Sequence, residues 1–265
     1  MTVDVRKWQS WGLISAIALL LLTATVMAAP AKTGQYNPND QTVEMFAAIE
    51  KGDIAVQLSF KDSTEGRMRI ENKTDKPLNV KLPDAFAGLP VLAQRNAGGG
   101  GGRNAGGGGR GGGGSQGMGG GGGMGMGGGM GMMNVAPEKV GQLDFVAVCL
   151  EHGKHEPRSN IPYEIKPLES FTTTPGVREL CQMLGTGQVD QRAVQAAAWH
   201  LNNGMTWEEL AAKRLHHTNG TSEPYFSPAA IQAGMQIATA AVRSALERQK
   251  QNNGTTTSLG NSPSQ

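Results

Sequence analysis

The two cysteines, Cys149 and Cys181, are the first candidates for chemistry in this sequence. Two cysteines in an exported protein normally form one intramolecular disulfide, so Cys149 and Cys181 are the disulfide candidates. The alternatives are free or buried thiols. The choice matters because a disulfide removes the thiolate that any reaction at Cys149 would need.

A second group of candidates lies in a glycine-rich tract, where methionines stand close together. Thioethers are soft ligands that suit Cu(I), so the tract is a candidate copper site. The alternative is a flexible low-complexity loop without a ligand. The candidate metal ligands are Met124, Met126, Met130, Met132 and Met133.

Established catalytic and cofactor motifs are not found in the sequence. Cys149, His152 and His155 have a spacing that zinc could use, but no paired ligand motif accompanies them, and surface histidines are the favoured interpretation. There is no Gly-x-Ser-x-Gly elbow, no His-Glu-x-x-His helix and no phosphate-binding loop. We therefore expect no catalytic residues, no enzyme activity and no cofactor.

A more specific pattern joins Cys149 to a later helical stretch. Val148-Cys149-Leu150 is followed by Val194-Gln195-Ala-Ala-Ala-Trp199, in which Gln195 and Trp199 share one helix face. The pattern resembles the thioester domains of bacterial surface adhesins. That resemblance implies an internal thioester between Cys149 and Gln195, open to attack by an amine on a host surface. Val148 stands where that family usually has an aromatic residue, and Cys181 offers Cys149 a competing partner.

The first 28 residues have the features of a secretory signal peptide. Arg6 and Lys7 form a positive region, 13–26 is apolar, and cleavage is expected after Ala28. The apolar run is short for a membrane anchor, so we expect cleavage and export to the periplasm or the cell exterior. The net charge of +2 is too small to indicate nucleic acid or a membrane surface as a partner.

The glycine tract, residues 98–133, divides the rest of the chain. It holds 24 of the 39 glycines and 6 of the 13 methionines, and such a run brings almost no side chains to a core. We expect a disordered insert in one fold, because loop closure costs rise slowly with length. The alternative is two domains joined by a linker, although the segment before the tract is short for a domain.

Short strands are predicted on both sides of the tract. A helix is expected at 42–51, and alternation of apolar and polar residues with polar turns between them predicts strands. We expect an α+β fold: an immunoglobulin-like β-sandwich interrupted by the glycine loop and followed by a small helical region. The predicted strands are 54–60, 67–71, 78–82, 89–94, 143–150 and 161–165.

Helical periodicity begins at Pro175. Asp190 is the expected N-cap of a helix over 191–201, Thr206 begins a capping box, and Ser227 precedes a long helix to about residue 250. The predicted divisions are a signal peptide (1–28), a linker (29–41), a helix and the first strands (42–97), the disordered insert (98–133), the remaining strands (134–174), the helical region (175–250) and a disordered tail (251–265).

A second resemblance covers most of the mature chain. The stretches MFAAIEKGDIAVQLSFKDSTEGRMRIENKTDKPLNVKLPDAFAGLPVLAQ, NVAPEKVGQLDFVAVCLEHGKHEPRSNIPYEIKPLE and QAAAWHLNNGMTWEELAAKR look like those of an exported family from planctomycete-type bacteria with a glycine-rich insert. The resemblance implies export and the insert, and it transfers no catalytic residue. We expect a structural or interaction module of the cell envelope, whose partner is an envelope or extracellular protein or polymer.

Overall fold

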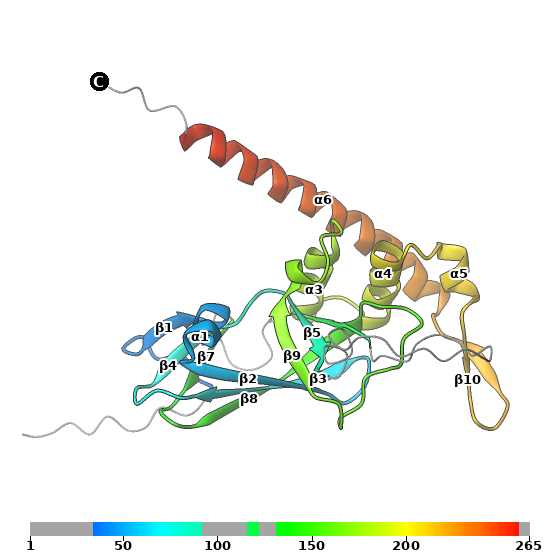
Figure 1. The fold of residues 1–265 in the computed structure, drawn as a ribbon. Coiled ribbons are helices and arrows are strands. Elements are labelled where there is room, and N and C mark those ends of the chain that lie inside the picture. The colour runs from blue at the N-terminus through cyan, green and yellow to red at the C-terminus, as the bar shows by residue number, and fades with distance from the viewer. Residues whose placement is uncertain (1–33, 92–115, 122–130, 260–265) are drawn as a thin grey trace, which may run out of the picture. The chain divides into compact units, whose positions relative to one another are not determined.

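The computed structural model describes residues 34–91, 116–121 and 131–259, with side chains described as far as residue 253 (Figure 1). Its centre is a closed six-stranded barrel in the order β2-β3-β8-β6-β5-β9, in which all neighbouring strands are antiparallel. The barrel strands are β2 (Ile54–Phe60), β3 (Glu65–Asn72), β5 (Phe86–Pro90), β6 (Met118–Gly120), β8 (Val140–Cys149) and β9 (Tyr163–Pro167).

The barrel corrects the predicted immunoglobulin-like sandwich, although the fold is α+β as expected. Short alternating strands with polar turns are common to sandwiches and barrels, so periodicity alone does not separate them. The deciding element is β6, which pairs with β5 on one side and β8 on the other and so closes the sheet. β6 comes from the glycine tract, where the sequence predicts no strand.

Aromatic rings fill the interior of the barrel. Phe60 makes edge-to-face contacts with Phe145 and Tyr163, and Phe86 makes one with Phe145, at centroid distances of 4.7 to 5.6 Å. Phe60 and Phe86 are completely buried. Edge-to-face packing of this kind adds to the stabilisation from apolar burial. The barrel is therefore a packed core.

Strand β6 fits because its glycines have no side chains. A Cβ atom on Gly120 would lie 2.5 Å from the ring of Phe86 inside the barrel. On the opposite face, a Cβ on Gly121 would lie 2.1 Å from the carbonyl oxygen of Cys181, in the helix that covers β6. Met118 is the one large side chain of the strand and is fully buried. Glycine thus allows the chain to pass between the aromatic core and a helix.

Several predicted divisions of the chain shift accordingly. The predicted insert 98–133 contributes β6 and the first residues of β7 (Met132–Val135). The last helix continues to Leu259, into the predicted tail. The end of the predicted linker is held in place, since the side-chain amide of Asn79 donates to the carbonyl oxygens of Asn37 and Asp40. The predicted signal peptide and cleavage site lie outside the described residues.

A small sheet lies beside one end of the barrel strands. It has the order β1-β4-β7, with β1 (Gln41–Glu44) parallel to β4 (Leu78–Lys81). The first part of the predicted helix 42–51 is strand β1, and α1 (Met45–Lys51) follows and ends at Gly52, which has the expected left-handed conformation. Val80 and Val135 of this sheet are fully buried in the same core as the barrel aromatics.

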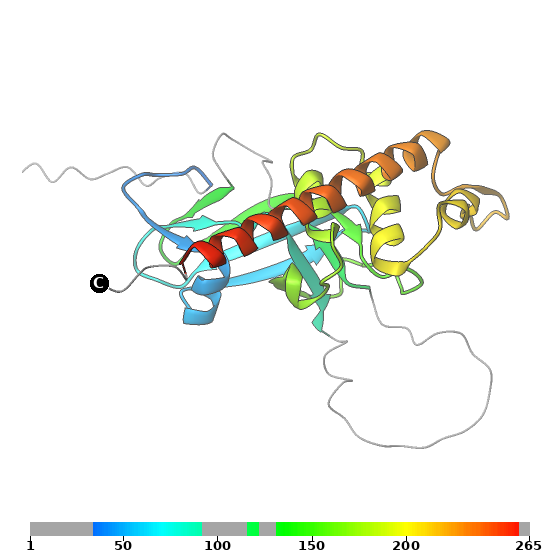
Figure 2. The ribbon, with the colours of Figure 1, turned by 90° about the horizontal axis from the view of Figure 1, so that it is seen from above.

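Helices cover one side of the barrel. The helices α3 (Val177–Gly185) and α4 (Gln191–Asn203) contact β8, and α6 (Pro228–Leu259) packs on both (Figure 2). The Asp190 N-cap and the Thr206 capping box of α5 (Trp207–Ala212) are confirmed. Between α5 and α6 the chain forms a hairpin of β10 (Arg214–His216) and β11 (Ser222–Pro224). No helix in the described ranges is long and apolar enough to span a bilayer.

The steric account of β6 gives a direct test. We expect Gly121→Ala to lower the free energy of unfolding by about 3 kcal/mol, because the new methyl group meets the backbone of α3, which has little room to shift. The matched control is Gly187→Ala, whose Cβ meets nothing within 4 Å but whose φ is +69°. That left-handed strain alone costs about 1 kcal/mol. Denaturant unfolding measures both changes, and equal losses would contradict the steric account.

Candidate functional site

The packing of α4 on β8 brings Gln195 to Cys149. The Gln195 carboxamide oxygen accepts a hydrogen bond from the backbone N–H of Cys149 at 2.8 Å, and its Nε2 donates to the Cys149 carbonyl oxygen at 2.8 Å. Both residues are 1% exposed. The two residues singled out by the thioester resemblance are therefore adjacent, and the contact that joins them is to the backbone of Cys149.

The edge of β8 is open at Cys149 because β3 does not extend that far. The β3–β8 pairing starts at Glu65 opposite Val146, and the last backbone contact beyond it is Ala147 N–H to the Thr64 carbonyl. Asp62 turns the chain away from β8 by accepting hydrogen bonds from the backbone of Thr64 and Glu65. The N–H and C=O of Cys149 would be buried without partners if no other group took the place of β3.

Side-chain amides of α4 supply the missing partners. Gln191, one turn before Gln195, donates from Nε2 to the Ala147 carbonyl oxygen at 2.9 Å. Further along the helix, Asn202 donates to the Leu150 carbonyl oxygen at 2.7 Å. The side chains of Gln191, Gln195 and Asn202 form what we term the amide row, and this row continues the hydrogen bonding of β8 past the end of β3. Gln195 thus has a structural role that the sequence pattern did not indicate.

The Cys149 thiol lies in the barrel interior. Its neighbours along the strand alternate, so that Ala147 belongs to the same core cluster while Val148 faces the helices. Burial raises the pKa of the Cys149 thiol well above its ordinary value, the charge of Glu156 adds to this rise, and the charge of Arg192 only partly opposes it. The thiol is therefore protonated at neutral pH, whereas the thiolate is the nucleophilic form.

Cys181 lies on the other side of the barrel wall. It is fully buried in the cluster between the barrel and the helices, and its sulfur is the nearest neighbour of a Cβ placed on Gly119. Burial raises the pKa of Cys181 to about 12. Cys149 and Cys181 are both free thiols. The structure does not bring the predicted disulfide pair together, because the two side chains occupy opposite faces of β8.

Trp199 anchors a cluster of aromatic side chains one turn after Gln195. Its ring is 4% exposed and contacts the rings of His152, Tyr225 and Phe226 at centroid distances of 4.8, 5.4 and 5.8 Å. Within the described part of the chain, its indole nitrogen has no hydrogen-bond partner. The cluster joins α4 to the loop after β8 and to the segment that follows β11.

Two cations lie over this aromatic cluster. The Lys213 ammonium is 5.2 Å from the centroid of Trp199 and 5.4 Å from that of Tyr225, and the Arg192 guanidinium carbon is 4.7 Å from the Tyr225 centroid. Lys213 Nζ also lies 2.9 Å from His152 Nε2. Burial lowers the pKa of Lys213, and burial followed by the charge of Lys213 lowers the pKa of His152. A neutral His152 can accept a hydrogen bond from the Lys213 ammonium.

The methionines of the candidate copper site are not gathered in the described part of the chain. Met124, Met126 and Met130 lie outside the described residues. Met132 and Met133 are consecutive in β7, so their side chains point to opposite faces, and Met133 is buried against Gly141 in the core. Within the described ranges, no three His, Cys, Asp or Glu side chains are grouped to hold a metal ion.

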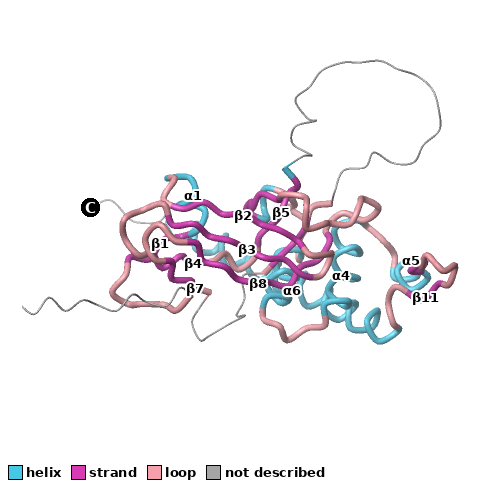
Figure 3. The backbone as a smooth tube through the Cα atoms, turned by 90° about the horizontal axis from the view of Figure 1, so that it is seen from below, coloured by secondary structure: helices cyan, strands magenta, loops and turns pink. Residues whose placement is uncertain are grey.

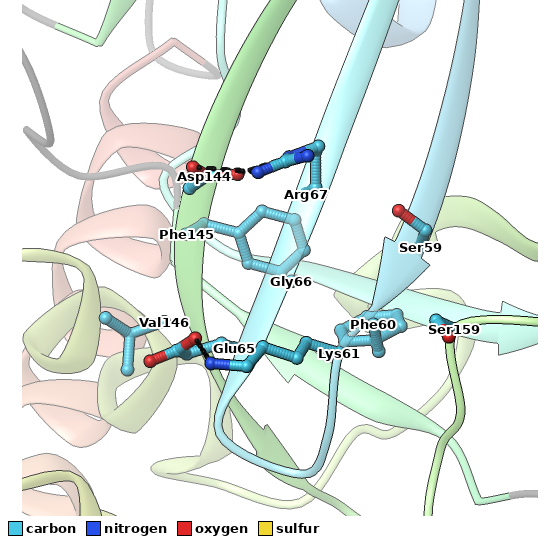
Figure 4. Close-up of a pocket in the computed structure, with 10 residues that line it drawn as sticks. All are labelled: Ser59, Phe60, Lys61, Glu65, Gly66, Arg67, Asp144, Phe145, Val146 and Ser159. Carbon is cyan, nitrogen blue, oxygen red and sulfur yellow. Dashed lines mark hydrogen bonds and ion pairs between the residues drawn. The ribbon is translucent and has the colours of Figure 1, made fainter.

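A surface cleft of about 650 Å³ lies over the neighbouring strands β2, β3 and β8 (Figure 4). Val146 is the exposed apolar residue of its lining, whereas the rings of Phe60 and Phe145 behind it are buried in the barrel. Two ion pairs flank the Val146 side chain: Arg67 Nε lies 2.6 Å from Asp144 Oδ1, and Lys61 Nζ lies 2.8 Å from Glu65 Oε2. Both pairs are exposed and so contribute little to stability. An exposed apolar side chain flanked by two ion pairs is an arrangement that can bind a partner.

The sequence did not indicate the cleft or the two cations that lie over the aromatic cluster. Arg192, Lys213 and Tyr225 come from segments that meet only in the folded chain. The type of each residue, taken alone, does not indicate a binding site. The alternation of charged and apolar residues in β3 and β8 could have indicated one open face, but not the hollow in it.

Comparisons of the chain with protein-family models, with curated proteins and with solved structures found no match.

The role of the amide row can be tested at Gln195. We expect Gln195→Ala to lower the free energy of unfolding by about 3 kcal/mol, because the buried N–H and C=O of Cys149 both lose their partners. Gln188→Ala is the control, since Gln188 is exposed and only its backbone is hydrogen-bonded, and it should change stability by less than about 0.5 kcal/mol. Equilibrium denaturation measures both, and a neutral Gln195→Ala would contradict the role.

Proposed function

We propose that the protein is an exported structural or interaction module of the cell envelope, without catalytic activity. The observation that carries the proposal is the contrast between the two sides of the barrel wall. The interior is filled by aromatic rings, whereas the outer face of β3 and of β8 up to Val146 presents exposed side chains. Helix α4 meets β8 beyond this stretch, near Cys149 (Figure 3). Contacts with a partner are then made on the outer surface.

The residues of that outer face suit a reversible contact. Arg67, Arg69, Glu71 and Asp144 alternate with the buried side chains of their strands, and Val146 is 39% exposed among them. The cleft between Val146 and the Lys61–Glu65 pair provides an apolar centre with a polar rim, the usual plan of a protein interface. We place the contact with an envelope protein or polymer at this cleft.

The proposal is tested by binding to envelope material. The chain from residue 29 onward is mixed with envelope fractions of the producing bacterium and sedimented. We expect binding that weakens about 10-fold in the double variant Arg67→Glu and Val146→Glu, because the variant reverses a rim charge and buries a carboxylate at the apolar centre.

The control is Arg243→Glu, an exposed position on α6 that does not line the cleft. It should bind like the unaltered protein. Circular dichroism and thermal melting establish that the variants are folded. Equal binding by the double variant, or no binding by the unaltered protein, would contradict the proposal.

A second candidate function, covalent adhesion through a thioester, is supported by the contact between Gln195 and Cys149. The Cys149 thiol would add to the Gln195 side-chain carbonyl carbon and ammonia would leave, so that one C–S bond replaces one C–N bond. An amine of a partner would later attack this carbonyl, forming an amide and releasing the thiol. The carboxamide is held at the backbone of the reacting residue, which limits the distance it must move.

Thioester formation has identifiable costs in this structure. The departing nitrogen is the donor to the Cys149 carbonyl oxygen, so one buried hydrogen bond is lost. The raised pKa of Cys149 also disfavours the thiolate that attacks the carbonyl. The Gln195 oxygen can still accept from the Cys149 N–H after the reaction.

Intact mass distinguishes this candidate from the first. A thioester lowers the mass of the mature chain by about 17 Da, and after denaturation leaves only Cys181 open to alkylation. Cys149→Ala should restore the nitrogen and remove the loss. An unchanged mass with both thiols alkylated would exclude covalent adhesion. A loss of about 2 Da with neither thiol alkylated would instead establish a disulfide.

A further inference from the structure

Three segments of the chain meet around Trp199. Helix α4 supplies Arg192 and Trp199, which lie two turns apart on one face. Lys213 and Tyr225 stand at the base of the β10–β11 hairpin, where the Tyr225 N–H donates to the Lys213 carbonyl oxygen at 2.9 Å. The loop after β8 brings His152 against the Trp199 ring. We term Arg192, Lys213, Tyr225 and His152 around Trp199 the cationic cluster.

The cationic cluster concentrates positive charge without a contacting counter-charge. Arg192 and Lys213 both lie over the ring of Tyr225, and neither forms an ion pair with a carboxylate in the described ranges. By contrast, Arg67 and Arg248 each pair with an acidic side chain. Because no carboxylate in the described ranges contacts either cation, both can attract an added anion.

Hydrogen-bond donors remain available in the cluster. Lys213 directs one proton to His152, which leaves two others on the ammonium group. The Trp199 indole N–H is buried and has no hydrogen-bond partner among the described residues. The aromatic rings hold both cations and reduce the conformational entropy that they would lose on binding a ligand. The cluster is therefore partly organised for an acceptor.

An acidic side chain close to the cluster limits the charge of that acceptor. Glu156 is exposed, and its charge acts on both Lys213 and Tyr225, although it makes no ion pair with either cation. It would repel a dianion such as phosphate or sulfate more strongly than a single carboxylate. The planar guanidinium of Arg192 matches the two oxygens of a carboxylate.

We propose that Arg192, Lys213 and Tyr225 form a binding site for a carboxylate group. The carboxylate comes from a free small acid or from a uronic acid unit of a polysaccharide, and both present the same two oxygens. The site is distinct from the cleft between β2, β3 and β8 and shares no residue with it. A carboxylate bound at this site would be a second ligand of the protein, in addition to the partner that we place at the cleft.

The test is titration calorimetry of the chain from residue 29 onward with acetate, galacturonate, polygalacturonate and sulfate. We expect galacturonate to bind more tightly than sulfate, and Lys213→Met and Arg192→Met each to weaken binding at least 10-fold. Arg243→Met, an exposed cation on α6, is the matched control and should stay within about twofold. Binding of acetate alone assigns the site to small acids, and tighter binding of the polymer assigns it to polysaccharide.

Glu156→Gln provides a variant that leaves the aromatic packing unchanged. Removing its negative charge should tighten carboxylate binding severalfold, which keeps the test decisive if a cluster variant is unstable. Absence of binding by every acid, equal or tighter binding of sulfate, or an equal loss in Arg243→Met would overturn the proposal.

Discussion

The hydrogen bonds from the side-chain amides of α4 to the end of β8 hold the helices and the barrel together. Strand β8 runs beyond the point where it pairs with Glu65, the first residue of β3, and Gln191 and Gln195 take the place of the missing strand. Because this edge is buried, each unpaired group would cost on the order of 1 to 3 kcal/mol. The same bonds hold α4 on the barrel and thereby position Arg192 and Trp199 beside Lys213 and Tyr225 at the base of the β10–β11 hairpin.

A second constraint is the lack of side chains at Gly119 and Gly120 of β6 and at Gly121, which follows it. The barrel closes only because the strand between β5 and β8 passes between the rings of the core and the backbone of α3. Part of the glycine tract is therefore a barrel strand rather than an insert. The filled interior that results is why we place the proposed contacts on the outer face and at the cationic cluster.

Local features of the fold could be predicted from the sequence, but its closure could not. Alternation located most strands, and capping residues such as Asp190 and Thr206 located helix starts, because these signals act over a few residues. The sandwich prediction was wrong because β6 has almost no side chains to show a period. The thioester resemblance singled out Gln195 and Cys149, but the contact found is to the backbone of Cys149 and follows from where β3 begins. The cationic cluster joins residues from distant segments, which no local pattern indicates.

Hydrogen exchange at the backbone N–H of Cys149 tests the central role of the amide row most directly. Ala147 N–H is the internal reference, since it donates to the Thr64 carbonyl and not to α4. We predict that both amides are protected in the unaltered protein, and that Gln195→Ala makes Cys149 exchange at least about 100-fold faster than Ala147, as loss of a local bond of about 3 kcal/mol implies. Fast exchange at Cys149 in the unaltered protein, or equal changes at both amides, would contradict the account.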